Sequence, residues 1–329
     1  MLILNLLPLY FIVFSANLVP SSRVWRWITI GSILLLNGVL FLVGLAVLAA
    51  GPSVLQEMLQ AELVDPEVMG LNLAWAGGLV LITAVVSTLL LVPPIRAAVI
   101  RGLRFDLEVD KTIHTTALVF ATWLVGLTVA QVFLLADLPV ELIAGQTELT
   151  LGALWEQGLA FVLFGILGVG LGLRRSLGET LERLGITGMT WRQVGIALAA
   201  VVILLLWDFL LTTVWQAIAP GSFERIAEIS ELLFGDVMGL FGALTIGLSA
   251  GIGEEVLFRG AIQPRFGLLA ATILFTVGHT QYEFSPALFS VFLIGLVLGI
   301  IRQRENTTTV ILIHAAYNAL NVLLAPLWT

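Results

Sequence analysis

The chain alternates long apolar stretches with short polar segments over its entire 329 residues. An apolar stretch of about 17 to 25 residues is long enough to cross a lipid bilayer as an α-helix. The pattern predicts ten such spans, at residues 2–20, 27–50, 71–92, 112–135, 154–173, 194–217, 237–262, 266–282, 287–301 and 307–326. We therefore expect an all-α fold, a polytopic bundle of transmembrane helices.

The composition supports this class and narrows the chemistry. Only 11% of the residues are charged and 59% are hydrophobic, whereas a soluble globular domain has roughly 25% charged residues. The chain contains no cysteine, which excludes disulfides and thiolate metal ligands. Its net charge of -7 argues against nucleic acid as a partner, so the lipid bilayer is the first partner we expect.

Basic and acidic residues alternate between successive loops. All but one of the 15 lysine and arginine residues lie before the even-numbered spans or just inside them, namely Arg23, Arg26, Arg96, Arg101, Arg104, Lys111, Arg174, Arg175, Arg183, Arg192, Arg259, Arg265, Arg302 and Arg304. The exception is Arg225. The other loops are acidic, with Glu57, Glu62, Asp65, Glu67, Asp137, Glu141, Glu148, Glu224, Glu228, Glu231 and Asp236.

This alternation predicts the orientation of the chain. Loops rich in lysine and arginine remain in the cytoplasm, so both termini are expected outside it. The first apolar run has no basic residue before it, unlike a cleavable signal peptide, and is expected to remain as a span. The host would be a bacterial plasma membrane or a related organellar membrane.

A coarse domain boundary is expected at residue 193. Leu177, Leu181 and Leu184 recur at helical spacing before it, which fits a short amphipathic helix on the cytoplasmic surface or a solvated connector. Polar residues inside the spans are scarce before this boundary and concentrated after it. We therefore divide the chain into an N-terminal transmembrane region of unknown role, 1–193, and a C-terminal region that carries the chemistry, 194–329.

Two adjacent carboxylates and an arginine interrupt the seventh span, in the stretch Gly251-Ile-Gly-Glu254-Glu255-Val-Leu-Phe-Arg259-Gly260. An isolated charge at this depth costs about 2.5–3.5 kcal/mol or more, so an ionisable cluster there indicates a functional site. Residues four apart share one face of a helix, and Glu255 and Arg259 are therefore expected to form an ion pair. Glu254 points elsewhere and is available to take and return protons.

Polar residues also interrupt later spans. His279 follows Phe275 by four residues, and Asn318 follows His314 by four. Each of these polar groups could merely bridge helices through hydrogen bonds. At about 1.5 Å per helical residue, Glu254, His279 and His314 lie about 16, 21 and 15 Å from the nearest loop arginine, in the middle portion of a core about 30 Å thick. They could therefore face one cavity.

A carboxylate, two histidines and an amide are groups that hydrolytic enzymes use. A glutamate and a histidine can polarise a water molecule for attack on a carbonyl, while a histidine and an amide donate to the developing oxyanion. Two histidines and a glutamate could instead bind zinc, although the His-Glu-x-x-His helix of the common zinc proteases is absent. The Gly-x-Ser-x-Gly motif of serine hydrolases is absent as well.

The polar motifs of the seventh, eighth and tenth predicted spans, taken in chain order, resemble those of the CPBP family of intramembrane glutamic proteases. This is the CAAX-protease and bacteriocin-processing family. The resemblance covers roughly residues 238–325 and rests on Glu254-Glu255-x-x-x-Arg259-Gly260, Phe275-x-x-x-His279 and His314-x-x-x-Asn318. It implies that Glu254 and His279 activate the water. It also implies that His314 and Asn318 stabilise the oxyanion.

For Glu255 and Arg259 the resemblance implies mainly architectural roles. It further implies an intramembrane endopeptidase that works without an essential metal or other cofactor, with a zinc protease as the second choice. The substrate would be a membrane protein or peptide, and use of prenylated CAAX substrates does not follow from the match. The sequence specifies neither the cleavage site nor the oligomeric state.

Two other functional classes stay open. A proton- or ion-coupled transporter would use Glu254, His279 and Asp208 as carriers. A non-catalytic membrane scaffold or immunity protein would not need Glu254 as a carboxylate.

Three further polar positions have simpler interpretations. Asp208, in the sixth span, has no obvious partner and is expected to cap or pair with a neighbouring helix if it is not a proton relay or a substrate contact. His114 is expected at the membrane interface, beside Lys111. Tyr282 and Glu283 are expected in a solvated outer turn.

Overall fold

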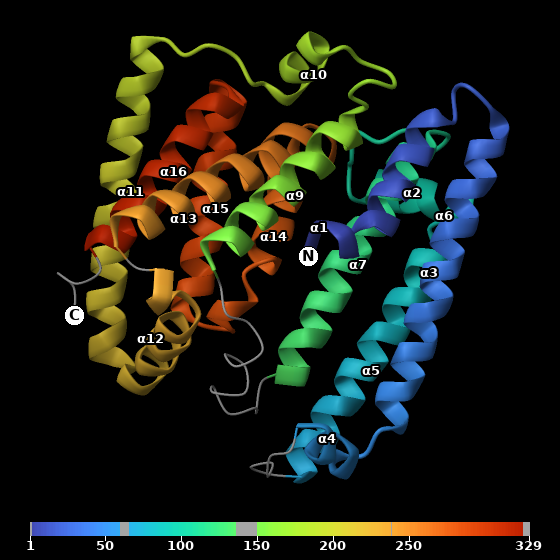
Figure 1. The fold of residues 1–329 in the computed structure, drawn as a ribbon, viewed down its shortest axis with the longest axis horizontal. Helices are drawn as coiled ribbons and strands as arrows, with labels where there is room; N and C mark the ends of the chain where they lie inside the picture. The colour runs from blue at the N-terminus through green and yellow to red at the C-terminus, as the bar shows by residue number, and fades with distance from the viewer. Residues whose placement is uncertain (1, 60–65, 136–149, 238, 325–329) are drawn as a thin grey trace. The chain divides into compact units, whose positions relative to one another are not determined.

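The computed structural model of the chain describes residues 2–59, 66–135, 150–237 and 239–324. These residues are helical nearly throughout, and their one β feature is an isolated bridge between Leu171 and Arg175. The predicted all-α fold is confirmed (Figure 1). In chain order the helices are α1 (Leu2–Asn5), α2 (Leu7–Leu18), α3 (Arg23–Ala49), α4 (Pro52–Leu59), α5 (Pro66–Leu89), α6 (Pro93–Gly102), α7 (Thr112–Leu135), α9 (Leu151–Val169), α10 (Leu177–Leu184), α11 (Trp191–Ile218), α12 (Pro220–Phe234), the 3₁₀ turn η1 (Gly235–Val237), α13 (Leu240–Glu254), the π-helix η2 (Glu255–Ile262), α14 (Gln263–Val277), the 3₁₀ turn η3 (Thr280–Tyr282), α15 (Pro286–Arg304) and α16 (Thr307–Leu324).

Eight helical segments in the described part of the chain are long and apolar enough to cross a membrane. They are Arg23–Ala49, Met69–Leu89, Thr112–Leu134, Leu151–Val169, Trp191–Ile218, Leu240–Val277, Pro286–Arg304 and Thr307–Leu324. The chain is therefore an integral, multi-pass membrane protein. The first predicted span corresponds to the short helices α1 and α2, and α2 has only 12 residues, fewer than a straight crossing needs.

The seventh and eighth predicted spans run together in the 38-residue segment Leu240–Val277. This segment is broken at Gly267, whose φ of 81° and ψ of 172° are not helical. Glycine adopts this combination readily because it has no Cβ. The break lies two residues beyond Arg265, at the second residue of the eighth predicted span.

The chain folds as two compact units. One combines Met1–Phe14 with Thr147–Thr329, and the other comprises Ser15–Gln146. Helices α9 and α10 therefore belong to the same unit as the C-terminal helices, although they precede residue 193. The division of roles between 1–193 and 194–329 stays a prediction.

In the second unit α3, α5 and α7 lie side by side (Figure 1). The side chain of Asn37 on α3 links the three helices. Its amide donates a hydrogen bond of 2.9 Å to Thr88 Oγ1, and its oxygen accepts from Ser87 Oγ at 2.8 Å and from Trp123 Nε1 at 2.9 Å. Hydrogen bonds of this kind hold apolar helices together where lipid provides no hydrophobic driving force.

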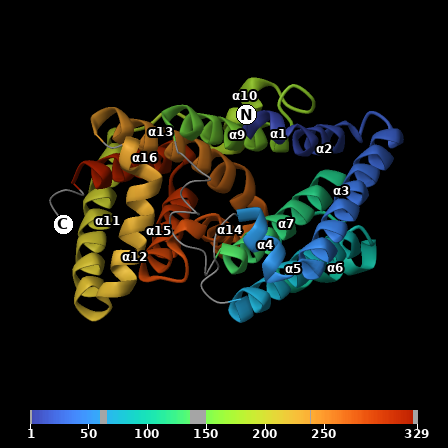
Figure 2. The same ribbon diagram turned by 60° about the horizontal axis from the view of Figure 1, so that its bottom comes forward.

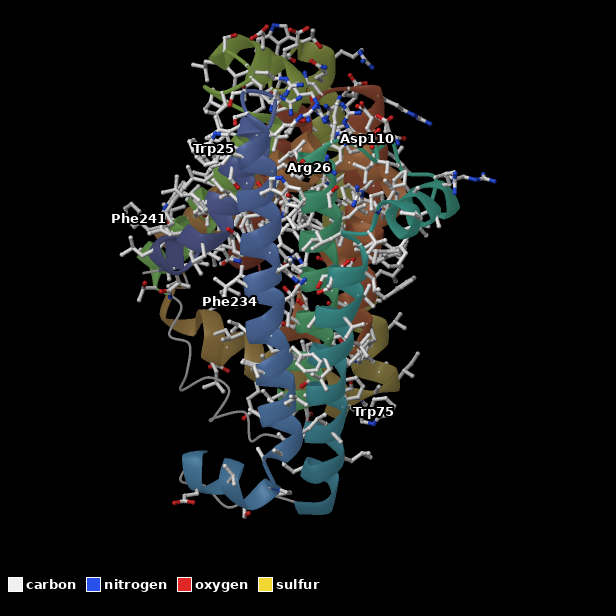
Figure 3. All side chains as sticks on the ribbon, turned by 90° about the vertical axis from the view of Figure 1, so that its right-hand side faces the viewer. Trp25, Arg26, Trp75, Asp110, Phe234 and Phe241 are labelled. Carbon is white, nitrogen blue, oxygen red and sulfur yellow. The ribbon has the colours of Figure 1, made fainter. Side chains whose placement is uncertain are left out.

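Two charged side chains mark one end of this unit. Arg26 and Asp110 lie there, whereas Trp75 on α5 lies toward the other end (Figure 3). His114 is in the first turn of α7 and accepts a hydrogen bond of 2.8 Å from the backbone N–H of Glu108. Several residues of the predicted acidic loops lie outside the described residues, namely Glu62, Asp65, Asp137, Glu141 and Glu148. The orientation of the termini stays a prediction.

In the first unit, α13 and η2 run between α9 and α16, and α11 packs against α15 and α16 (Figure 2). Glycines of α13 permit this close approach. A Cβ atom at Gly251 would lie 2.8 Å from the backbone nitrogen of Ala315 on α16, and one at Gly253 would lie 2.7 Å from Cα of Gly158 on α9. The small residues that precede Glu254 therefore press its helix directly against two neighbouring backbones.

The segment before residue 193 contains the amphipathic helix α10. Its N-terminus carries a capping box, in which Ser176 and Glu179 satisfy each other's backbone N–H groups. These hydrogen bonds from Ser176 lower the pKa of Glu179 below its ordinary value. On the opposite face, Leu184 is fully buried and would lie 3.1 Å from a Cβ at Gly260. Helix α10 thus packs closely against η2 at Gly260, where a larger side chain would meet Leu184.

Candidate active site

The expected ion pair between Glu255 and Arg259 is present in η2. Arg259 Nη1 donates to Glu255 Oε1 at 2.9 Å, and both side chains are almost completely buried. The guanidinium also donates to the carbonyl of Gly295 on α15 at 3.1 Å and lies 4.1 Å above the ring of Phe275 on α14. One arginine therefore joins three helical elements, and its position at the centre of a buried cluster accounts for an otherwise costly charge.

His314 joins the same cluster from α16. Its Nδ1 lies 2.7 Å from Glu255 Oε1, and its Nε2 lies 4.0 Å from Glu254 Oε2. Because Glu255 Oε1 also accepts from Arg259, this carboxylate is an acceptor and His314 Nδ1 is the donor. The second ring nitrogen consequently faces the neighbouring glutamate.

His279 approaches Glu254 from the segment just after α14 ends. Its Nδ1 lies 2.8 Å from the carbonyl oxygen of Phe275, and its Nε2 lies 3.9 Å from Glu254 Oε2. The Phe275 ring packs against both histidines, with centroids 4.7 Å from His279 and 6.0 Å from His314. The spacing of Phe275 and His279 thus serves two purposes, because it supplies both the backbone acceptor and the ring that supports the imidazole.

Glu254 lies where these contacts converge. Its side chain is 12% exposed, and Oε2 is buried with no hydrogen-bond partner among the described residues. Glu255 Oε2 is also buried without a hydrogen-bond partner among the described residues, so what distinguishes Glu254 is that its Oε2 faces Nε2 of both His279 and His314. The structure therefore brings together Glu254, His279 and His314 from three helical segments.

Asn318 lies one helical turn after His314 on α16 and is half-buried. Among the described contacts, none joins its amide to Glu254, His279 or His314. Its connection with the cluster is that it shares a face of α16 with His314, since residues four apart lie one above the other on a helix.

Asp208 on α11 does have partners. It accepts hydrogen bonds from Tyr317, from Asn321 Nδ2 at 2.7 Å and from Ser290 Oγ at 3.0 Å. Trp207 Nε1 in turn donates to Ser290 Oγ at 2.9 Å. The sequence offered no partner for Asp208 because these donors lie on α15 and α16, and the network now shows that Asp208 joins three helices.

The turn after His279 is less simple than the sequence indicated. Tyr282 lies parallel to the His279 ring, with 6.3 Å between centroids and 6° between planes. Glu283 is bound by Arg225 on α12, through contacts of 3.1 Å from Nε and 2.7 Å from Nη2. Sequence reasoning missed this pair, yet Arg225 carried a signal because it is the one basic residue that departs from the charge alternation.

Comparison with known families gives a match for the part of the chain that holds this cluster. Residues 236–320 match the Rce1-like family, described as type II CAAX prenyl endopeptidase Rce1-like. These residues are similar to the Rce1-like family of CAAX proteases. The match covers about a quarter of the chain, includes all the motif residues from Glu254 to Asn318, and does not reach the second unit. Neither curated proteins nor solved structures gave a match to the chain.

Within the described ranges, no group of three or more histidine, aspartate or glutamate side chains has the geometry of a metal site. His314 Nδ1 is engaged by Glu255, and His279 Nδ1 by a backbone carbonyl, so only one nitrogen of each ring faces Glu254.

Proposed function

We propose that the chain is an intramembrane endopeptidase that hydrolyses a peptide bond of a membrane-associated protein or peptide. The observation that carries this proposal is the position of Glu254 Oε2, buried without a hydrogen bond and 3.9 and 4.0 Å from the Nε2 atoms of His279 and His314. These separations are too long for direct hydrogen bonds but suit a bridging water molecule. The Rce1-like match of residues 236–320 supports the same reaction class.

The hydrogen bonds around His279 define what it can do. A carbonyl oxygen only accepts, so the Nδ1 atom beside Phe275 carries the hydrogen and Nε2 of the neutral ring carries a lone pair. Glu254 is an acceptor as well when ionised. A water between them would donate one proton to Glu254 and the other to His279, which directs an oxygen lone pair toward the substrate carbonyl.

His314 is placed to act as a donor instead. Its Nδ1–H is directed to Glu255, so Nε2 can donate only if the ring is protonated. With a hydrogen on Nε2 as well, the ring would present an N–H group on the side of Glu254. We therefore assign His314 and Asn318 to the oxyanion.

The reaction follows from these assignments. The water oxygen forms a bond to the carbonyl carbon while one of its protons passes to Glu254. The oxyanion of the tetrahedral intermediate accepts hydrogen bonds from His314 and Asn318. When the intermediate collapses, the C–N bond breaks and Glu254 returns the proton to the leaving nitrogen, which yields one new carboxyl terminus and one new amino terminus.

No metal or other cofactor takes part in this reaction as we propose it. Glu255 and Arg259 mainly hold the neighbouring helices together. The excess of basic residues in alternate loops supports an outside location of both termini. The substrate class is a membrane-associated peptide, and the first unit alone supplies every residue assigned to the chemistry.

The decisive experiment compares wild type with Glu254→Ala and His279→Ala. Proteomics of membrane fragments from cells that carry each variant should reveal peptides released by wild type alone. Purified protein in liposomes should then cleave the identified substrate, and a farnesylated, internally quenched C-a-a-X peptide is a second probe. We expect both variants to fold and to lose activity by about 10²-fold or more.

Three outcomes would contradict the proposal. Full activity of Glu254→Ala would refute the mechanism. Proton-coupled uptake into proteoliposomes without proteolysis would favour a transporter. Normal function of Glu254→Gln in cells would favour a scaffold or immunity role.

A further inference from the structure

An ion pair joins α12 to the end of the turn that follows His279. Arg225 of α12 contacts both carboxylate oxygens of Glu283 through Nε, each at 3.1 Å, and one of them through Nη2 at 2.7 Å. Two-point contact between a guanidinium and a carboxylate fixes orientation as well as distance. The side chains are 35% and 33% exposed, so neither is surrounded by water.

The backbone at Glu283 is held in an unfavourable conformation. Its φ is 46° and its ψ is -157°, a combination suited to glycine and rare for a residue with a side chain. Such a conformation persists only where surrounding contacts impose it. The N–H of Glu283 donates to Thr280 O at 2.9 Å, and that of Tyr282 donates to His279 O at 3.2 Å. The strained residue is therefore coupled to His279 through a single tight turn.

The partner helix connects this turn with the other catalytic candidate. Helix α12 contacts η3 and leads through η1 into α13, which ends at Glu254. Arg225 thus joins the segment that leads to Glu254 with the turn that follows His279. This also explains why one arginine departs from the charge pattern of the loops.

We propose that Arg225 and Glu283 are positioning residues, whose ion pair sets the distance between His279 and Glu254. This inference rests on the proposed function, because the distance matters only if the two side chains share a water. Partly exposed ion pairs contribute little to stability. We therefore expect the pair to affect the position of His279 rather than the stability of the fold, and its loss should lower catalysis more than folding stability.

Kinetics with charge variants test the proposal. Arg225→Gln and Glu283→Gln should each lower kcat by roughly 10- to 100-fold, as expected for a displacement of about 1 Å, with KM nearly unchanged. The charge-swapped protein Arg225→Glu/Glu283→Arg should recover most of kcat. Glu283→Gly relieves the backbone but removes the carboxylate, and should stay as slow as Glu283→Gln. The substrate is whichever of the two probes named above wild type cleaves.

The ion pair between Arg192 and Glu305 is a matched control. It also has two close contacts, at 2.6 and 2.7 Å, but touches none of the four residues assigned to the chemistry. Arg192→Gln should therefore keep the wild-type kcat. Normal kcat in both Arg225→Gln and Glu283→Gln, or no recovery in the charge-swapped protein, would overturn the proposal.

A second readout does not depend on proteolysis. The chain lacks cysteine, and Phe284 is 81% exposed next to Glu283, so a nitroxide attached to Phe284→Cys reports the turn alone. The label should be immobilised when the ion pair is intact, mobile in Arg225→Gln, and immobilised again in the charge-swapped protein. Equal mobility in all three would refute the ion pair as the anchor of the turn. If wild type proves to have no proteolytic activity, the proposed function fails, and the label still decides whether the pair holds the His279 turn.

Discussion

His314 forms a hydrogen bond with Glu255 but not with Glu254. Its Nδ1 lies 2.7 Å from Glu255 Oε1, whereas its Nε2 faces Glu254 Oε2 at 4.0 Å. Two adjacent glutamates therefore act on the two nitrogens of one ring. Glu255 orients the imidazole as well as binding Arg259, which gives it a larger role than the architectural one expected from the sequence.

Glu255→Gln should destabilise the fold. It removes the counter-charge of the fully buried Arg259, and breaking a buried pair in this way costs about 3–5 kcal/mol. Denaturant titration in detergent should show an earlier unfolding midpoint. Arg192→Gln is the control, because its partly exposed pair should contribute at most about 1 kcal/mol. Equal midpoints for Glu255→Gln and wild type would show that the pair does not hold the helices.

Gly251→Ala should separate Glu254 from His314. The added Cβ would lie 2.8 Å from the nitrogen of Ala315, so α13 and α16 must move apart. Overpacking of this kind costs about 1–3 kcal/mol, and activity should fall with stability. Gly195→Ala on α11 meets nothing within 4 Å, and should leave activity unchanged. A Gly251→Ala protein with normal stability and turnover would mean that this contact is not tight.

Asp208 and Tyr317 should show energetic coupling. Loss of either partner leaves a polar group in an apolar core, at a cost of about 1–3 kcal/mol. A double-mutant cycle with Asp208→Asn and Tyr317→Phe should give an interaction energy of about 0.5–3 kcal/mol. Strictly additive effects on the unfolding free energy would contradict the network. Thr213→Val, on the exposed side of the same helix α11, should change stability by less than about 0.5 kcal/mol.

Chelators should leave proteolysis unchanged. The proposed reaction uses Glu254 and His279 directly, without a Lewis acid to polarise the carbonyl. Activity measured in the presence of 1,10-phenanthroline or EDTA should equal that of untreated protein. Inactivation that added zinc reverses would replace the proposed mechanism with a metal-dependent one.

Much of the fold was predictable from the sequence because the bilayer constrains helices so strongly. Every predicted span contains helix. The observed helices differ from the predicted spans where a helix is too short to cross the membrane or where a single glycine interrupts it. The first span is divided between α1 and α2, and the seventh and eighth continue as one segment until Gly267. Neither feature changes the hydrophobic pattern, and so neither could be read from it.

The candidate site was predictable only in part. Glu255 and Arg259 pair within one helix, so their spacing sufficed. The partners of Asp208 and of Arg225 lie 58 to 113 residues away in the sequence, on other helices. No local pattern encodes such pairs, because they depend on how each helix is rotated against its neighbours.

By itself, the sequence determined that this is an all-α membrane protein with ionisable groups inside its spans, since apolar length and the cost of buried charge are local properties. It also determined the order of the motifs that carry the chemistry. Tertiary structure decided which of these groups meet. Packing of Gly251 against Ala315 brings α13 to α16, and Phe275 contacts the rings of both histidines, so that Glu254, His279 and His314 face a common point.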